Sequence, residues 1–165
     1  MLFNCLFLFM VGSVLGYLLE LFYRRFTKQK WIKPGVFKGI YLPLYGMGLC
    51  ICYFAYTLNI NFVFKIALTI FLLTFIEFLC GIIFIKYFKL PLWDYSNNFL
   101  NYKGLICFKF SIYWGILSFI FIKFVFPFIN FSLFINKFIF VIYILCFVVI
   151  VDVLVTMYKY IKNKL

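Results

Sequence analysis

The chain has 165 residues, of which 68% are hydrophobic and only 12% are charged, and its formal net charge is +12. Water-soluble domains are about 45–50% apolar, so this composition excludes an ordinary soluble fold. The chain contains no histidine, which excludes histidine metal ligands, histidine proton relays and Ser-His-Asp triads. The basic residues flank apolar segments, a pattern typical of membrane orientation rather than of nucleic-acid binding.

Apolar segments long enough to cross a membrane recur along the chain. A helix needs about 20 apolar residues to cross the hydrocarbon core, and the segments that meet this requirement are 2–23, 40–60, 62–85, 110–129 and 136–158. We therefore predict an all-α integral membrane protein with about five transmembrane helices, in a single polytopic domain (1–165). The first segment lacks a basic flank and a small-residue cleavage site, so we expect it to be retained rather than removed as a signal peptide.

The basic residues predict the orientation of these segments. Most of them lie in the 24–39 loop, the 86–109 loop and the C-terminal tail, at Arg24, Arg25, Lys28, Lys30, Lys33, Lys38, Lys86, Lys89, Lys103, Lys109, Lys159, Lys162 and Lys164. The other side carries Lys65, Lys123 and Lys137. Because cytoplasmic loops carry an excess of Lys and Arg, we predict the N-terminus outside and the C-terminus in the cytoplasm.

Carboxylates are rare in this chain, which makes each of them informative. They are Glu20, Glu77, Asp94 and Asp152, and all except Asp94 lie within apolar segments. An ionised group there costs roughly 2.5–3.5 kcal/mol on insertion scales and usually faces protein or water. We expect these residues to line a polar vestibule near the cytoplasmic half. The alternative is that each carboxylate is simply protonated or is neutralised by a nearby Lys or Arg, such as Lys159 two turns beyond Asp152.

The first apolar segment carries a face of small residues that ends in a carboxylate. Gly12, Gly16 and Glu20 are spaced four residues apart, so they share one face of a helix. Two glycines at this spacing allow another helix to approach closely, and the same face would turn Glu20 toward the protein interior. The alternative role for Glu20 is an ion pair with Arg24, four residues on.

The second segment begins with the sequence KPGVFKGIYLPLYGMG. Pro43 would leave a helical carbonyl without its usual donor, and Gly46 and Gly48 would loosen the following turn. We predict a helix broken at membrane depth, where irregular backbone is tolerated if it is buried in protein or lines a cavity. Such a break could bind a ligand together with Lys38 and Tyr45, or it could serve packing alone.

Two further helix faces are lined by small or polar residues. Their members are Ala67, Thr74, Glu77 and Gly81 in the third segment, and Ser111, Gly115 and Ser118 in the fourth. Thr69 falls off the first of these faces. Because a polar face turns toward protein or water more often than toward lipid, we expect Gly81 and Gly115 to mark helix packing.

The 86–109 loop contains LPLWDYSNNFLNYKG. Trp93, Tyr95 and Tyr102 suit the membrane interface, where aromatic rings sit at headgroup level. Asp94 could cap a short interfacial helix, accept hydrogen bonds from Tyr or Lys, or take part in chemistry.

These motifs, taken in order, resemble one known family. They are Gly16 and Glu20, Gly35-Val36-Phe37-Lys38-Gly39, Pro43-Leu44-Tyr45-Gly46-Met47-Gly48, Glu77 and Gly81, Trp93-Asp94-Tyr95-Ser96, Asn101 and Gly104, Ser111, and Trp114-Gly115. The set is similar to the bacterial putative ABC-transporter type IV family over most of residues 10–118. The last segment carries no motif of that family, and Pro34 stands where the family tends to have Arg.

The resemblance implies a permease subunit in the bacterial cell membrane. The chain has no GxxxxGK[ST] motif, so an ATPase would be a separate polypeptide. Five spans are few for a pathway, so a homo-oligomer is also expected, and the sequence leaves the identity of any cofactor unknown. The residues expected to form the binding site are Glu20, Lys38, Pro43, Tyr45, Glu77, Asp94 and Tyr95.

Two alternatives to transport remain open from the sequence. One is a membrane-embedded enzyme acting on a lipid or polyprenyl headgroup. Asp94 would be its general base or a metal ligand, and Lys103 with the basic residues of the 24–39 loop would hold a phosphate. The absence of histidine and of paired carboxylates disfavours it. The other is a non-catalytic scaffold or regulatory subunit, in which the face of Gly12 and Gly16 makes subunit contacts.

Overall fold

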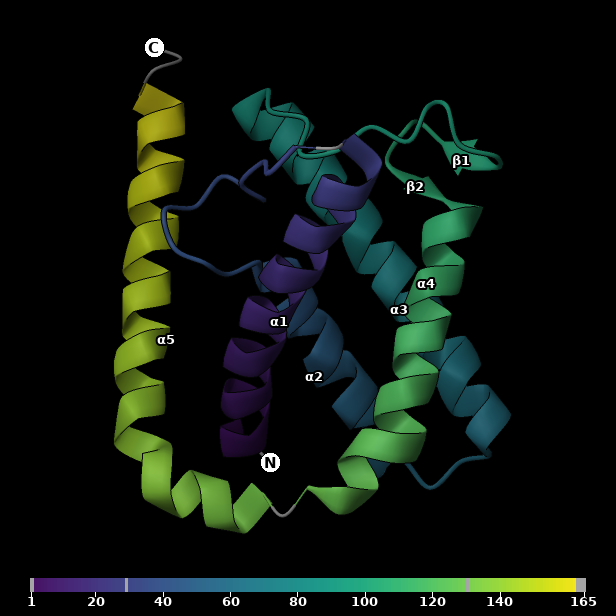
Figure 1. Cartoon of the computed structure of the whole chain (residues 1–165), viewed down its shortest axis with the longest axis vertical. Helices are drawn as coiled ribbons and strands as arrows, with labels where there is room; N and C mark the ends of the chain where they lie inside the picture. The colour runs from purple at the N-terminus through teal and green to yellow at the C-terminus, as the bar shows by residue number, and fades with distance from the viewer. Residues whose placement is uncertain (1, 29, 130, 163–165) are drawn as a thin grey trace. The chain divides into compact units, whose positions relative to one another are not determined.

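Helices make up most of the computed structural model, which describes residues 2–28, 30–129 and 131–162 (Figure 1). The α-helices are α1 (Leu2–Lys28), α2 (Pro43–Thr57), α3 (Phe62–Ile83), α4 (Phe108–Ile120) and α5 (Phe131–Lys162). Short π-helical and 3-10 turns prolong α3 and α4, at Phe84–Phe88, Phe121–Val125 and Phe126–Phe128. Strands β1 (Asn101–Tyr102) and β2 (Ile106–Cys107) form a small antiparallel hairpin before α4. Lys164 and the side chains of Lys28 and Lys137 lie outside the described residues.

Within the described residues, four helical stretches are long and apolar enough to cross a membrane. They are Leu2–Thr27, Phe62–Phe88, Phe108–Phe128 and Phe138–Lys162. Their side chains are largely exposed, as expected for helices that face lipid. The prediction of an all-helical membrane protein is therefore confirmed in its main part.

The predicted second span is wrong as a continuous helix. α2 has 15 residues, which extend about 22 Å at 1.5 Å per residue, whereas the hydrocarbon core is about 30 Å thick. The helix begins at Pro43, where the missing N–H costs nothing because the first turn has no intrahelical acceptor for it. Pro43 therefore starts a helix rather than breaking one, and the residues before it are not helical.

The chain divides into two compact units. Unit 1 comprises residues 1–49 and 130–165, and unit 2 comprises residues 50–129. The prediction that residues 1–165 form one domain stays a prediction, and each unit is described by itself below.

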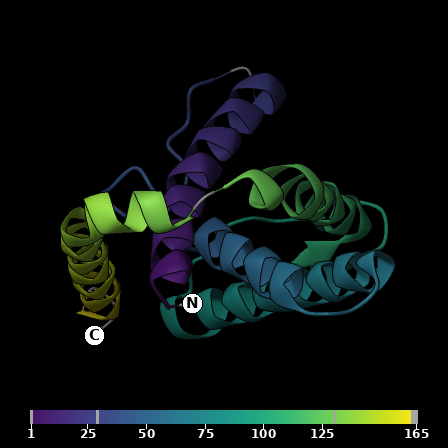
Figure 2. The same ribbon diagram turned by 90° about the horizontal axis from the view of Figure 1, so that it is seen from below.

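In unit 1, α1 and α5 run in the same direction (Figures 1 and 2). The non-helical segment before α2, residues 30–42, lies beside them and is called the coil below. The rings of Phe3, near the start of α1, and Tyr143 of α5 meet edge to face with their centroids 5.9 Å apart. Further along, the coil bonds to both helices. The N–H of Leu42 donates to the carbonyl of Ser13 in α1 at 2.9 Å, and Gly39 bonds to Asp152 in α5.

The glycine face of α1 packs against α2 of the same chain. A Cβ added at Gly12 would lie 2.9 Å from the Cβ of Leu49, and one added at Gly16 would overlap the side chain of Tyr45. The alternative in which Gly12 and Gly16 make subunit contacts is therefore wrong in its choice of surface, because α2 already covers this face.

In unit 2, α3 packs against α4 and the β-hairpin. Thr74 donates to Ser111 at 3.0 Å, and a Cβ at Gly115 would lie 2.9 Å from the Cδ1 of Ile70. A Cβ at Gly81 would lie equally close to Leu105, just before β2.

The packed face of α3 is rotated from the predicted one. Its buried residues are Thr69, Leu73, Glu77 and Gly81, whereas Ala67 is exposed. At about 100° per residue around the helix axis, Ala67 and Thr74 lie just outside the face formed by these buried residues. The difference arises because the prediction chose the packed face by its small and polar residues. Leu73 is as apolar as its exposed neighbours, so it was not recognised as part of that face, and the predicted face was centred too close to Ala67.

Substitution of Gly46 by alanine tests the packing of α1 on α2. Its Cβ would clash with the hydroxyl of Ser13 and lie 2.5 Å from the carbonyl oxygen of Phe9. Because backbone cannot move aside as a side-chain end can, we expect destabilisation of about 1–3 kcal/mol. The measurement is the thermal unfolding midpoint in one detergent. Leu15→Phe, at an exposed position of α1, is the control, and an equal loss in both variants would contradict the prediction.

Candidate functional site

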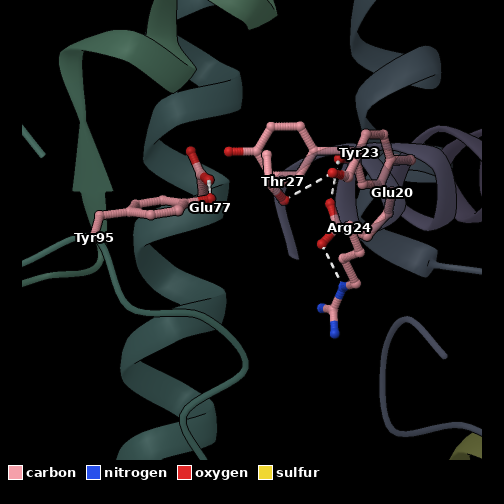
Figure 3. A network of polar contacts seen from close by, with 7 residues as sticks. Glu20, Tyr23, Arg24, Thr27, Glu77 and Tyr95 are labelled. Carbon is pink, nitrogen blue, oxygen red and sulfur yellow. Dashed lines mark hydrogen bonds and ion pairs between the residues drawn. The ribbon is translucent and has the colours of Figure 1, made fainter. Parts of the chain in front are cut away.

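The most deeply buried carboxylate of the described chain belongs to Glu77 in α3, which is 3% exposed. Tyr95 donates its hydroxyl to Glu77 Oε1 at 3.0 Å, and Trp114 donates its indole N–H to Oε2 at 3.0 Å. Figure 3 shows the ring of Tyr95 extending from its loop toward Glu77. Both carboxylate oxygens are thus engaged by donors, which is what a buried polar group requires.

The 93–107 loop is built to hold Tyr95 in this position. Trp93 donates its indole N–H to the carbonyl of Leu105 at 2.7 Å, and the N–H of Tyr95 donates to the carbonyl of Gly104 at 2.8 Å. The Tyr95 ring also stacks on Phe110 of α4, with a centroid separation of 4.4 Å. The motif that looked like an interfacial aromatic belt therefore positions a hydroxyl group on a buried carboxylate.

Asn101 and Gly104 complete the same loop. The side-chain amide of Asn101 donates to the carbonyls of Ser96 and Asn98, and its oxygen accepts from the N–H of Gly104. Gly104 has φ +68, and a Cβ there would lie 2.8 Å from Asp94 Oδ1. Glycine is therefore required at this position for both its backbone conformation and its small size.

Asp94 closes a turn and lies away from any buried site. Its Oδ1 accepts from the N–H of Ser96 at 2.9 Å, and the residue is exposed. These bonds from Ser96 hold the pKa of Asp94 below its ordinary value. Because this pKa is lowered on folding, the stabilisation is present at neutral pH and is lost as the pH falls through the folded pKa. The short interfacial helix that Asp94 could have capped is absent from this described loop, which forms turns and the hairpin instead.

A second carboxylate site lies in unit 1, at Asp152 of α5. Asp152 Oδ2 accepts from the N–H of Gly39 at 3.0 Å and from the hydroxyl of Tyr41 at 2.5 Å. Its Oδ1 accepts from Thr156, one turn further on, at 3.1 Å. The carboxylate therefore ties the coil before α2 to the last helix.

The sequence reading missed this role of Asp152. Neutralisation by Lys159 is wrong, because Asp152 bonds to three neutral donors and forms no ion pair with the described Lys159. Gly39 and Asp152 are 113 residues apart, so no local spacing could have linked them. The available signals were the rarity of carboxylates in this chain and a tyrosine beside the glycines of the coil.

Glu20 has the ion pair that its spacing allowed. Arg24 Nε lies 2.8 Å from Glu20 Oε1, one helical turn along α1 (Figure 3). The hydroxyl of Tyr45 lies 3.5 Å from Oε2, at the outer limit for a hydrogen bond. The structure thus brings Glu20 and Tyr45 together in unit 1, and Glu77 and Tyr95 together in unit 2. Lys38 lies beside Gly39 in the coil of unit 1, and its side chain is exposed.

No group of three or more Cys, Asp or Glu side chains that could hold a metal ion occurs among the described residues. In the hydrogen bonds described above, the carboxylates of Glu77 and Asp152 accept from hydroxyl and N–H donors. Such groups can bind a cation, accept a proton, or fix neighbouring backbone.

Comparison with known proteins gives one family. The family model described as “Putative ABC-transporter type IV” matches residues 7–157. No curated protein and no solved structure matches the chain. The family match confirms the resemblance seen in the sequence, and it extends beyond residue 118 to include Asp152 in α5.

Loss of the Tyr95 hydroxyl tests how Glu77 is held. In Tyr95→Phe, Glu77 Oε1 loses a donor in a buried position, which we expect to cost about 1–3 kcal/mol. Tyr113→Phe, on the lipid-exposed side of α4, removes a hydroxyl without a described hydrogen bond and is the matched control. The measurement is the thermal unfolding midpoint in detergent. Equal midpoints for the two variants would show that the Tyr95 bond contributes nothing.

Removal of the Asp152 carboxylate tests its hold on the coil. In Asp152→Leu, Gly39 and Tyr41 lose their acceptor, so we expect amide hydrogen exchange in a peptide covering residues 34–42 to accelerate about tenfold or more. Leu154→Ala, at an exposed position of the same helix, should leave the exchange unchanged. Unchanged protection in Asp152→Leu would mean that other contacts hold the coil.

Proposed function

The chain belongs to the putative ABC-transporter type IV family, and from this premise we propose that it is the permease subunit of a membrane transporter. The family and the four helices of membrane-spanning character support a transport-related membrane protein. The finer proposal concerns which part of the chain serves transport, and it rests on one observation in unit 1.

That observation is irregular backbone at membrane depth. Ser13, which accepts from Leu42, is 11 residues from the start of the Leu2–Thr27 span and 14 from its end, or about 16 Å and 21 Å along the helix. The coil that precedes α2 therefore reaches the middle of the predicted membrane span. Non-helical backbone at this depth occurs where it is buried in protein or lines a cavity, and in transporters it forms substrate and ion sites.

Polar groups accompany the coil at this depth. Asp152 lies 10 residues from the end of the Phe138–Lys162 span, about 15 Å along the helix. The hydroxyl of Ser13 is buried and has no hydrogen-bond partner among the described residues. Burying a polar group in a low-dielectric interior costs free energy unless the group forms a hydrogen bond, for example with a bound ligand. These features support a polar site at the break before α2, in which Lys38, Pro43 and Tyr45 were expected from the sequence.

Glu77 is the corresponding candidate in unit 2. Its burial and its Tyr95 and Trp114 donors support a proposed role in binding a cation or a proton during transport. Glu20 is the weaker candidate, because Arg24 already compensates its charge.

We further propose the setting in which this subunit works. The ATPase is a separate polypeptide that docks on the 24–39 and 86–109 loops, which face the cytoplasm together with the C-terminus. The chain resides in the bacterial plasma membrane and assembles as a homo-oligomer. The distribution of Lys and Arg supports this orientation.

The enzyme alternative gains no support from the site. Asp94, its proposed general base, is exposed and has its Oδ1 engaged by Ser96 in a turn. A structural role therefore accounts for this residue.

Isolation of the intact complex tests the permease proposal. We expect the tagged full chain, extracted into nanodiscs from its own membrane, to carry an ATPase in a fixed stoichiometry, detected by mass spectrometry. Lys30→Glu should reduce ATPase recovery several-fold, because it reverses a charge in the proposed docking loop. Lys123→Glu places the same change at the predicted opposite side and is the control. Recovery of a homo-oligomer without an ATPase would overturn the proposal.

A further inference from the structure

A basic cavity of about 280 Å³ lies in unit 1, between the coil and the end of α5. Its lining residues are Val36, Lys38, Thr156, Lys159 and Tyr160. We propose that this cavity binds a phosphate group, carried either by an anionic phospholipid headgroup or by a phosphate-bearing solute. The proposal does not depend on the transport role, because it rests on the lining of this cavity alone.

The charge of the cavity favours an anion. Lys38 comes from the coil and Lys159 from α5, so two lysines from different elements line one cavity. The nearest described carboxylate is Asp152, to which the lining residue Thr156 donates. Its other oxygen accepts from Gly39 and Tyr41. Two lysines against one engaged carboxylate leave the cavity with a net positive charge.

The coil is fixed at the position where Lys38 enters the cavity. Gly39, the next residue, is bonded to Asp152, and Lys33 Nζ donates to the carbonyl of Lys38 at 2.8 Å. The backbone of Lys38 is therefore held from both sides, and Lys33 adds a third ammonium group to the same segment. A cation on a fixed backbone loses less conformational freedom when it binds a ligand.

The size and chemistry of the cavity suit a phosphate. A volume of about 280 Å³ is at the lower end of the range for small-molecule sites, so it accommodates a headgroup rather than a whole lipid. Lysine binds phosphate as a point charge, and Tyr160 contributes a hydroxyl-bearing side chain to the lining. Basic pockets at the ends of membrane helices bind anionic headgroups, and this cavity lies in the last two turns of α5.

Helix electrostatics offers a simpler explanation for the lysines. Basic residues in the last turn of α5 compensate the helix dipole, and both Lys159 and Lys162 lie there. Only Lys159 of this pair lines the cavity. Lys162 is therefore a charge-matched control on the same helix.

Two binding measurements on the purified full chain test the proposal. The first is native mass spectrometry of phospholipid retained after exchange from phosphatidylglycerol vesicles, at about 0.5 M salt, where surface attraction is screened beyond about 4 Å. The second is calorimetric titration of the same detergent-solubilised protein with inorganic phosphate. The variants are Lys38→Gln, Lys159→Gln and Lys159→Arg, with Lys162→Gln and Lys30→Gln as controls.

We expect Lys38→Gln and Lys159→Gln each to weaken binding about fivefold, and Lys159→Arg to retain it. Loss confined to the lipid measurement assigns the site to a headgroup, and loss confined to the titration assigns it to a solute. Absence of binding in both measurements, or an equal loss in Lys162→Gln, would overturn the proposal. Thermal unfolding of each variant verifies folding, and both lysines are exposed.

Discussion

The bond between the Asp152 carboxylate and the coil before α2 is the interaction on which unit 1 depends. Without it, the N–H of Gly39 and the hydroxyl of the buried Tyr41 would lose this acceptor, and a buried polar group without a partner is expensive. With it, a non-helical segment is held beside α1 and α5 by hydrogen bonds to both helices. The same bond fixes the coil next to Lys38, which lines the cavity, whereas Pro43 marks the start of the short α2.

In unit 2, Glu77 likewise binds an irregular segment through a tyrosine hydroxyl. In both units a carboxylate accepts one tyrosine hydroxyl and one N–H group, so its oxygens are engaged by neutral donors. The donors come from irregular segments, the coil at Gly39 and the loop at Tyr95, and the acceptors come from long helices. Each carboxylate thus fixes a segment that has no regular hydrogen bonding of its own.

The sequence predicted the elements better than their partners. Hydropathy located α1, α3, α4 and α5, since long apolar runs need no knowledge of the rest of the chain. It failed at residues 40–42, because an extended apolar stretch and a helical one have the same hydropathy, and only the bond from Leu42 to Ser13 distinguishes them. The family motifs marked Tyr95 and Glu77 separately but did not pair them. Asp152 was underestimated because its partner Gly39 lies far away in sequence, and register between distant segments is set by tertiary packing.

The separation of Gly39 from Asp152 also bears on how the chain is made. The coil emerges from the ribosome early, whereas its acceptor follows 113 residues later. At about 5–20 residues per second, that interval is on the order of ten seconds. During it, the N–H of Gly39 and the hydroxyl of Tyr41 must be satisfied by water or by the insertion machinery. The final hydrogen bonding of this coil therefore depends on the arrival of the last helix.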